Sequence, residues 1–392
     1  MDSDAALRWA WAEVDLGAIR HNVAAIRTTV APASVRAVVK ANGYGHGAVD
    51  VANAALDAGA TGLCVALVQE AVELRAAGID APILILTEQP PEQFGAMIAA
   101  DVEATAYRED YLEALATAAL AHDAVVPVHI KVDSGMQRVG APPDQLAALV
   151  ASVAERPSLR LAGVFTHLAV ADEPDRDATG YQLARFDAAL ASVTDVDVPV
   201  VHAVNSAGAL VAPGARHSFV RLGIAMYGIS PGPDVGHLTT ELRPALALKA
   251  RVSLVKRVEA GTHVSYGWRH RFDRPTTVAT VPIGYADGVP RRLGTLPDRP
   301  GAVVLIGGVR HPIVGVVTMD QLVVDVGDTT VAIGDEVVLI GRQGDHEMRR
   351  ALGRPARHDR LRGGVRHLGP GAASRGRSMK SAGSMRRHGP TL

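Results

Sequence analysis

One lysine stands where an apolar segment of the chain ends. Lys40 closes the run VRAVV within the stretch AVVKANGYGHG at residues 37–47, whose three glycines would let the backbone come close to a ligand. A lysine at the end of a buried strand is costly to desolvate as an ammonium, so its pKa should fall. The resulting free amine could form a Schiff base with an aldehyde. Taken alone, such a lysine is more often structural, with its ammonium reaching solvent.

Other polar side chains stand at the ends of other apolar runs. They are Arg138, His167, Asn205, Ser206 and Arg221. A single histidine or arginine in such a place is usually structural. Together with Lys40 there are six, and the carboxyl ends of parallel strands meet at one mouth of a barrel, where catalytic groups collect. The pattern therefore predicts one shared site.

The apolar runs alternate with Ala/Leu-rich helical stretches from about Glu13 to Arg221. Continuous Val/Ile/Leu runs are typical of parallel strands that are buried on both faces. Eight such runs occur, at residues 35–43, 62–67, 82–87, 102–107, 126–135, 161–170, 200–208 and 219–228. Eight β-then-α units predict an α/β fold with an N-terminal (β/α)8 barrel like that of triosephosphate isomerase. A doubly wound sheet is the competing interpretation.

After residue 242 the helical pattern stops, and short strands follow, separated by Gly, Pro and Asp turns. We therefore expect a barrel at 1–242 and an all-β domain at 243–345, and the alternative is that the first dozen or so residues join the β domain. Residues 346–392 contain no Phe, Tyr, Trp or Ile and show no periodicity. With so little to bury, they are expected to form a basic, disordered tail.

Composition narrows the class of protein. The single cysteine, Cys64, excludes a disulfide framework and a Cys-rich metal site, and no metal is expected. The chain has no apolar leader and no run of about 18 apolar residues, so we expect a cytoplasmic protein without a membrane partner. The tail at 346–392 carries 12 basic and two acidic residues, which leaves 28 basic and 39 acidic residues in 1–345. This acidic body argues against a nucleic-acid partner.

Eight motifs resemble those of the alanine racemase family, in the same order, over about residues 11–345. They are VVKANGYGHG, KVDSGMQRVG, THLAVADE, HAVNSAG, VRLGIAMYG, VSYGW, PIGYADGVPR and VGVVTMDQ. The resemblance implies a pyridoxal-phosphate enzyme with a (β/α)8 barrel and a C-terminal β domain. It also implies a homodimer whose active sites draw residues from both subunits.

The resemblance assigns two catalytic residues. Lys40 matches the lysine that holds pyridoxal phosphate covalently and serves as the base on one face of the substrate. Tyr266, in VSYGW, matches the base that reaches the opposite face from the partner subunit. A racemase requires both, because one base removes the α-proton while the other returns it from behind. His167 matches a residue beside this tyrosine, and Arg221 matches one behind it that also faces the cofactor's pyridine nitrogen.

Further residues follow from the same resemblance. Those that correspond to the cofactor's phosphate site and its surroundings are Tyr44, Asn205, Ser206, Gly223 and Ile224. Those that correspond to the site of the substrate carboxylate are Arg138 and, from the other subunit, Met319. Lys131 matches a lysine that is carbamylated in many members, and a carbamate would orient Arg138 through a charge-assisted bond.

Four more residues match the family's access corridor or its substrate end: Asp172, Tyr285, Arg291 and Asp320. For Asp172 and Arg291 a solvated surface position is an equal alternative. The family also ends with an apolar strand whose first tyrosine contributes to the phosphate site, and nothing after Asp345 resembles it. This difference concerns the C-terminus alone.

A frameshift would explain the unusual tail. Back-translating residues 357–370 with suitable codons and moving the frame by one nucleotide gives GTIAYEVVCGISA, which resembles the family's missing strand. We therefore hypothesise a frameshift near codon 345, which would remove a core strand and one phosphate-site hydroxyl. A natural basic tail that contacts RNA or a membrane is the alternative.

These observations predict an enzyme that interconverts L-alanine and D-alanine by a two-base mechanism and supplies D-alanine for cell-wall peptidoglycan. A serine or broad-specificity racemase of the same fold is the first alternative, because enzymes discriminate weakly against one added hydroxyl. A decarboxylase of this fold would place an acid where Arg221 stands, and a non-catalytic cofactor carrier would lack VSYGW and VTMDQ. A catalytically impaired product of the frameshift remains a further alternative.

Overall fold

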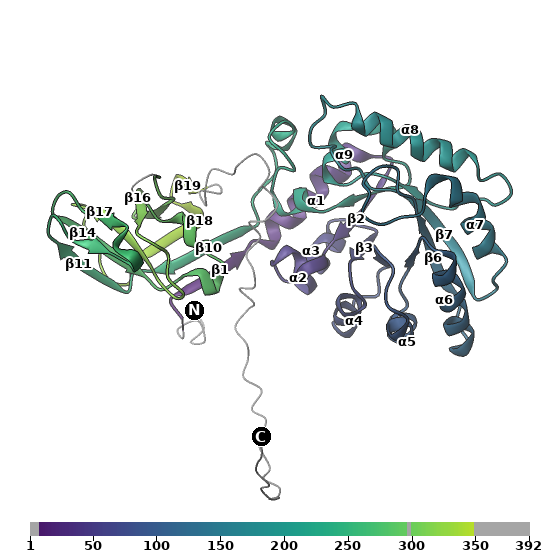
Figure 1. Ribbon diagram of the computed structural model, residues 1–392, viewed down its shortest axis with the longest axis horizontal. Coiled ribbons are helices and arrows are strands. Elements are labelled where there is room, and N and C mark those ends of the chain that lie inside the picture. The colour runs from purple at the N-terminus through teal and green to yellow at the C-terminus, as the bar shows by residue number, and fades with distance from the viewer. Residues whose placement is uncertain (1–7, 296–298, 349–392) are drawn as a thin grey trace, which may run out of the picture.

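Two lobes lie end to end in the computed structural model, which describes residues 8–295 and 299–348 (Figure 1). The larger lobe holds helices around a set of strands, and the smaller lobe consists mainly of strands. Two segments connect the lobes: β1 (Ala10–Val14) leads into α1 (Leu16–Val30), and β10 (Leu246–Arg251) leads back into the smaller lobe. The N-terminal strand and the described residues from 246 onward therefore share one lobe.

Parallel strands form the centre of the larger lobe. They are β2 (Ser34–Val38), β3 (Gly62–Val65), β4 (Ile83–Ile85), β5 (Ala104–Ala106), β6 (Val126–Lys131), β7 (Leu159–Phe165), β8 (Val201–His202) and β9 (Phe219–Leu222). They pair in two sheets of four, in the orders β4-β3-β2-β9 and β5-β6-β7-β8. All residues of β3, β4 and β5 are buried, as expected for strands covered on both faces.

Two seams join these sheets into a closed ring. Between β4 and β5, the backbone N–H of Ile85 donates to the carbonyl of Glu103 at 3.0 Å, and that of Glu103 donates to Ile83 at 2.8 Å. Between β8 and β9, the N–H of Arg221 donates to the carbonyl of Val204 at 3.1 Å. A doubly wound sheet would keep two open edges. The (β/α)8 barrel is therefore confirmed, and the doubly wound alternative is wrong.

Helices surround the ring. They are α1, α2 (Lys40–Tyr44), α3 (Ala48–Asp57), α4 (Val68–Ala76), α5 (Phe94–Ala99), α6 (Glu109–Ala121), α7 (Leu146–Ala154), α8 (Ala178–Ala191) and α9 (Ser206–Val211). The longest, α1, begins where the carboxylate of Asp15 accepts the N–H of Ala18 at 2.9 Å. Its residues Ile19, Val23 and Val30 are buried on one face. The helix contacts β2 of the ring and its neighbours α3 and α9 in the helical layer.

The smaller lobe is built on a curled antiparallel sheet. Its strands, besides β1 and β10, are β11 (Leu254–Val258), β14 (Thr276–Val281), β15 (Val303–Ile306), β16 (Val309–Val314), β17 (Leu322–Gly327), β18 (Glu336–Gln343) and β19 (His346–Met348). A separate pair, β12 (His263–Val264) and β13 (His270–Arg271), stands beside it. Along β17, Leu322, Val324 and Val326 are buried and alternate with more accessible residues, so one face of the sheet covers the core.

Two strands lie at the limits that the sequence suggested for the lobes. Strand β1 pairs with β10 from Ala10 opposite Ala250 to Val14 opposite Leu246, so these N-terminal residues belong to the β-rich lobe. At the other limit, β19 pairs with β18, with His346 opposite Gln343. Regular pairing thus continues for three residues into the segment expected to be a disordered tail. The remaining tail residues, 349–392, and the frameshift hypothesis lie outside the described residues.

Candidate active site

Lys40 lies at the carboxyl end of β2 and begins α2. Burial lowers the pKa of its amine, and the guanidinium of Arg138 lowers it further, while the carboxylate of Glu70 acts in the opposite direction. The direction of the shift is the one that its place at a strand end suggested. The lysine is therefore biased toward the neutral amine that a Schiff base requires.

The backbone turns left-handed directly after this lysine. Three residues other than glycine have positive φ there: Ala41 (53°), Asn42 (53°) and Tyr44 (54°). Such angles are strained for L-residues, and strain of this kind persists only where neighbours hold it. Here Glu70 accepts the N–H of Ala41 at 2.5 Å, and the side chain of Asn42 accepts the N–H of Ala48 at 2.8 Å. The turn brings the hydroxyl of Tyr44 close to Gly223, which follows β9.

Lys40 belongs to a group of four cations, in which the two arginines lower the pKa of both lysines. The group consists of Lys40, Lys131, Arg138 and Arg221. Lys131 is the last residue of β6, and burial together with the charges of Arg221, Arg138 and Lys40 lowers the pKa of its amine to about 7. A concentration of positive charge in a barrel mouth attracts anionic ligands. The arrangement therefore suits a ligand that carries phosphate and carboxylate groups.

Arg138 comes into this group because the loop after β6 folds back on its own strand. The carboxylate of Asp133 accepts the N–H of Gly135 at 2.9 Å and that of Gln137 at 3.1 Å. The N–H of Ala141 then returns to the carbonyl of Lys131 at 2.8 Å. The guanidinium of Arg138 is exposed, as a group that receives a substrate carboxylate from solvent would be.

Arg221 is buried in β9, and its terminal nitrogens contact only neutral hydrogen-bond acceptors. Its Nη2 lies 3.2 Å from Nδ1 of His167 and donates to the carbonyls of Thr166 at 2.7 Å and Ala203 at 2.9 Å. Its Nη1 lies 2.6 Å from Nδ1 of His202. Arginine can only donate hydrogen bonds, so the Nδ1 atom of each of these two histidines must be unprotonated. Burial and the charge of Arg221 hold the pKa of each histidine well below its usual range.

A small polar cradle lies between α9 and β9. The hydroxyl of Ser206, at the first position of α9, accepts the N–H of Gly223 at 2.9 Å and that of Ala225 at 3.3 Å. A Cβ on Gly223 would lie 3.0 Å from the hydroxyl oxygen of Tyr44. Hydroxyls and backbone amides that converge beside a barrel mouth suit a phosphate group. The amide of Ala225 was not predicted, because a backbone N–H leaves no signal in the residue type.

Asn205 holds in place the helix end that carries this cradle. Its side-chain oxygen accepts the N–H of Gly208 at 3.0 Å and so caps α9, and its amide donates to the carbonyl of Leu168 at 3.3 Å. Ile224 begins the 3-10 turn Ile224–Tyr227, which follows Gly223. These contacts fix the position of Ser206 and of the turn that carries the two amides.

A second set of predicted residues lies in the β-rich lobe. Tyr266 and Met319 have exposed fractions of 67% and 52%, unusually high for an aromatic and an apolar side chain. Tyr285 packs under the guanidinium of Arg291, whose Cζ lies 5.5 Å from the ring centroid, and the N–H of Ala286 donates to the carbonyl of Met319 at 3.0 Å. No hydrogen bond or ion pair among the described residues joins these side chains to Lys40. Within one chain, the two sets therefore stay apart.

Two further residues predicted for the site, Asp172 and Asp320, lie apart from both groups. Asp172 follows β7 in the larger lobe, where its side chain packs against Gly232. Asp320 is exposed and lines a shallow surface hollow of the β-rich lobe together with Arg8 and Asp287, which form an ion pair with each other. Neither carboxylate contacts the cation group among the described residues.

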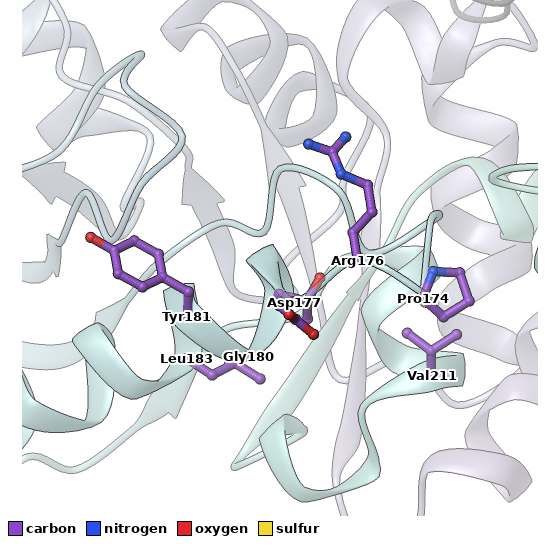
Figure 2. A pocket seen from close by; sticks show the side chains of 8 residues that line it. Pro174, Arg176, Asp177, Gly180, Tyr181, Leu183 and Val211 are labelled. Atoms are coloured by element: carbon purple, nitrogen blue, oxygen red, sulfur yellow. The ribbon is translucent and has the colours of Figure 1, made fainter.

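A different hollow lies on the outer surface beside α8. Figure 2 shows Arg176, Asp177 and Tyr181 along its wall, with Val211 of α9 across from them. None of the residues predicted for the active site lines it. The chemistry of the strand ends is therefore concentrated at the barrel mouth and not in this hollow.

Comparison with known families decides the relationship. The profile "Alanine racemase, N-terminal domain" matches residues 14–231, and "Alanine racemase, C-terminal domain" matches residues 245–353. The chain belongs to the alanine racemase family. The resemblance that the eight motifs indicated is thereby confirmed, and the second match extends eight residues beyond the limit of about 345 inferred from those motifs.

Individual relatives agree with this assignment. The alanine racemase of Symbiobacterium thermophilum is 47% identical over 351 residues, which cover 89% of this chain and 91% of that protein. The crystal structure of alanine racemase from Bacillus anthracis with bound L-Ala-P matches with a TM-score of 0.81 at 40% identity, covering 87% of this chain and 88% of that one. A histidine racemase from Leuconostoc mesenteroides matches with a TM-score of 0.80 at 29% identity, covering 88% and 92%.

As a member of this family, the chain is an enzyme of the isomerase class. Among the described residues, no helix is long and apolar enough to cross a membrane. In the same part of the chain, no three side chains of His, Cys, Asp or Glu gather as metal ligands would.

Proposed function

We propose that this chain interconverts L-alanine and D-alanine, with pyridoxal phosphate joined covalently to Lys40. The observation that carries the proposal is the position of Lys40, a lysine of lowered pKa, beside Arg138 and Arg221 at a barrel mouth. An amine nucleophile among cations suits a cofactor that is both an aldehyde and an anion.

The cofactor phosphate would lie in the cradle of Ser206, the amides of Gly223 and Ile224, and the hydroxyl of Tyr44. The short approach of Tyr44 to Gly223 and the convergence of two amides on Ser206 support this placement. When bound, pyridoxal phosphate draws electrons from the α-carbon and makes its proton acidic. Arg221 would face the ring nitrogen; because a guanidinium does not give up its proton readily, it would leave that nitrogen unprotonated.

Two groups would handle the α-proton. Lys40 would act on one face of the substrate and Tyr266 of the partner subunit on the other. The bond from Arg221 to Nδ1 of His167 supports this arrangement, because it leaves the proton of His167 on Nε2, where it can be donated to the phenol oxygen of the partner's Tyr266. Removal from one side and return from the other inverts the α-carbon.

The substrate carboxylate would be bound by Arg138 and by the backbone of Met319 of the partner subunit. A carbamate on Lys131 would add an anion that orients Arg138. The pKa of about 7 for the Lys131 amine supports this modification, because only the neutral amine reacts with carbon dioxide.

A homodimer would bring the two sets of residues together. The exposure of Tyr266, Trp268 and Met319 on the β-rich lobe supports such pairing, because exposed apolar side chains that gather in one patch mark interaction sites. The D-alanine formed would supply peptidoglycan synthesis in the cytoplasm.

Borohydride reduction and isotope exchange test this proposal together. Reduction should fix the cofactor on the peptide that contains Lys40, and Lys40→Ala should abolish the label, whereas Lys256→Ala on the exposed strand β11 should keep it. In deuterated water, L-alanine should yield D-alanine with deuterium at the α-carbon. Labelling at another lysine, or no exchange by a folded and labelled protein, would contradict the proposal.

A racemase of broader specificity is the second candidate. The match to a histidine racemase of the same fold favours testing it, because this architecture accommodates more than one amino acid. Serine and histidine offered beside alanine would distinguish the candidates through their kcat/KM ratios.

Impaired activity of this polypeptide is the alternative that the C-terminus raises. A chain in which the upstream reading frame is restored should then be more active than the present one. Equal D-alanine formation by both chains would remove this alternative.

A further inference from the structure

A line of polar side chains runs through the interior of the barrel, beneath the cation group. It begins at Arg221 in β9, passes through His202 in β8 and His129 in β6, and reaches Glu103 directly before β5. Arg36 in β2 closes the line by binding Glu103 with both terminal nitrogens. Barrel interiors are usually filled by apolar side chains, so five polar residues in contact call for an explanation.

The hydrogen bonds of this line have one direction. Nη1 of Arg221 lies 2.6 Å from Nδ1 of His202, and because arginine can only donate, the proton of His202 must be on Nε2. That Nε2 lies 3.2 Å from Nδ1 of His129, which must accept, so the proton of His129 is also on Nε2. Every bond therefore donates away from Arg221.

The line ends at Glu103, whose carboxylate is the only group in the line that can accept hydrogen bonds and has none to donate. Nε2 of His129 lies 3.2 Å from Oε2 of Glu103, which is an electrostatic contact and not a hydrogen bond, because the N–H does not point at that oxygen. The guanidinium of Arg36 and the ring of His129 hold the pKa of Glu103 at about 2, despite its burial. Glu103 is thus a carboxylate, and a carboxylate accepts hydrogen bonds only.

The surroundings leave these rings little freedom. The imidazole of His202 stacks on Phe165 at 4.6 Å and on Phe219 at 4.2 Å between ring centroids, and Arg36 lies over Phe219 at 4.4 Å. Glu103 is fixed by the backbone, because it makes the two hydrogen bonds of the seam between β4 and β5. A change in its charge would therefore be transmitted along the line instead of being absorbed by side-chain movement.

We propose that Glu103 is a positioning residue for Arg221, acting through His129 and His202. Its negative charge favours a proton on the nearby Nε2 of His129, and this adds to the effect of Arg221, which requires an unprotonated Nδ1 on His202. With the opposite tautomer, His202 would direct an N–H at Arg221 and displace it from the barrel mouth. The role in catalysis rests on the proposed function, whereas the state of the two rings does not.

The ring states can be measured directly on the full chain labelled with 15N-histidine. In the unchanged protein, the signals of His129 and His202, assigned from His129→Gln and His202→Gln, should each show one protonated and one unprotonated nitrogen. In Glu103→Gln the signals of His129 should move toward the averaged values of exchanging tautomers, and those of His202 should follow to a smaller extent, because Arg221 still faces its Nδ1. Unchanged signals in Glu103→Gln would overturn the proposal, whether or not the protein racemises alanine.

Kinetics separate positioning from a purely structural role. Glu103→Gln should lower kcat by about 10- to 100-fold, the range typical of outer-shell partners, with little change in KM. Glu103→Asp should restore part of the loss, because it returns the carboxylate. Glu109→Gln, which removes the Arg156 partner on the outer helices, should leave kcat unchanged.

A double variant decides whether Glu103 serves only Arg36. Arg36→Met combined with Glu103→Gln removes both charges and leaves no unpaired guanidinium. It should recover the thermal stability that Glu103→Gln loses, while the averaged ring signals and the low kcat persist. Recovery of kcat and of the single-tautomer signals in the double variant would overturn the proposal. A folded, unchanged chain that shows the expected ring signals but no racemisation would contradict the proposed function instead.

Discussion

Lys131 and Arg221 share one aromatic ring. Nζ of Lys131 lies 5.3 Å from the centroid of Phe165, and Cζ of Arg221 lies 5.2 Å from the same centroid. The face of an aromatic ring attracts a cation, but two cations on one ring also repel each other. Of the two, the guanidinium keeps its charge more readily, so the amine of Lys131 is the group that loses its proton.

Lys131 should therefore make the stability of the cofactor-free protein rise with pH. The pKa of its amine is about 7 in the folded chain, against 10.5 for an ordinary lysine. Between these values the unfolded chain binds a proton that the folded chain does not, so the unfolding free energy increases with pH. Lys131→Met should flatten this rise between pH 7 and pH 9.5 in urea unfolding, measured without added cofactor or carbon dioxide.

Lys249→Met is the matched control. The pKa of Lys249 is raised by its hydrogen bonds and ion pairs with Glu13 and Glu336, although burial acts in the opposite direction. A lysine with a raised pKa loses its stabilising effect only above its ordinary pKa, outside this pH range. The control should change the level of stability but not its slope, and an equal slope in Lys131→Met and the unchanged protein would contradict the prediction.

Gly223 should be required for tight cofactor binding. A methyl group there would lie 3.0 Å from the hydroxyl of Tyr44 and 3.8 Å from that of Ser206, so Gly223→Ala would push the cradle apart. Overpacking usually costs about 1–3 kcal/mol. We expect the dissociation constant for pyridoxal phosphate to rise by about tenfold or more. Gly214→Ala, where a Cβ meets no atom within 4 Å, should leave it unchanged.

The barrel was predictable because its apolar runs have the length and continuity of buried parallel strands, and Lys40 and Arg221 stand at or near the ends of such runs. The left-handed turn was not predictable, since Ala41 and Asn42 carry no local signal for positive φ and depend on Glu70 and Ala48 to hold it. Glu103 and His202 were missed for another reason. Their interaction through His129 joins three strands of one sheet, and only the curvature of the barrel brings the side chains of β6 and β8 together across β7.

Complementation between subunits should reveal whether Tyr266 acts across the dimer. Lys40→Ala and Tyr266→Phe should each be nearly inactive alone. In a mixed dimer, one site would combine the intact Lys40 of one chain with the intact Tyr266 of the partner subunit. A symmetric mixture holds about half mixed dimers, so about a quarter of the unchanged activity should return.

A second mixture controls this experiment. Lys40 and Arg221 lie at the same mouth of one barrel, so mixing Lys40→Ala with Arg221→Ala gives no intact site in any dimer. This mixture should stay inactive. Recovery in both mixtures, or in neither, would show that Tyr266 does not serve the other subunit's site.

Asn22 should be essential to the connection between the two lobes. Its fully buried side chain donates to the carbonyls of Met226 at 2.9 Å and Arg243 at 2.8 Å, and accepts the N–H of Arg243 at 2.8 Å. These bonds hold the chain where it leaves the barrel for β10. In Asn22→Ala the backbone groups would be left buried without these partners, at about 1–3 kcal/mol for each group that stays unsatisfied.

We therefore expect Asn22→Ala to lower the unfolding free energy by about 3 kcal/mol or more, a large part of the total of about 5–15 kcal/mol typical of folded proteins. Urea unfolding monitored by tryptophan fluorescence would measure the loss. Thr28→Ala removes an exposed hydroxyl that donates to Ala24 on the same helix, and it should change stability by less than about 0.5 kcal/mol. If the two variants unfold alike, the bonds to Arg243 and Met226 do not hold the junction.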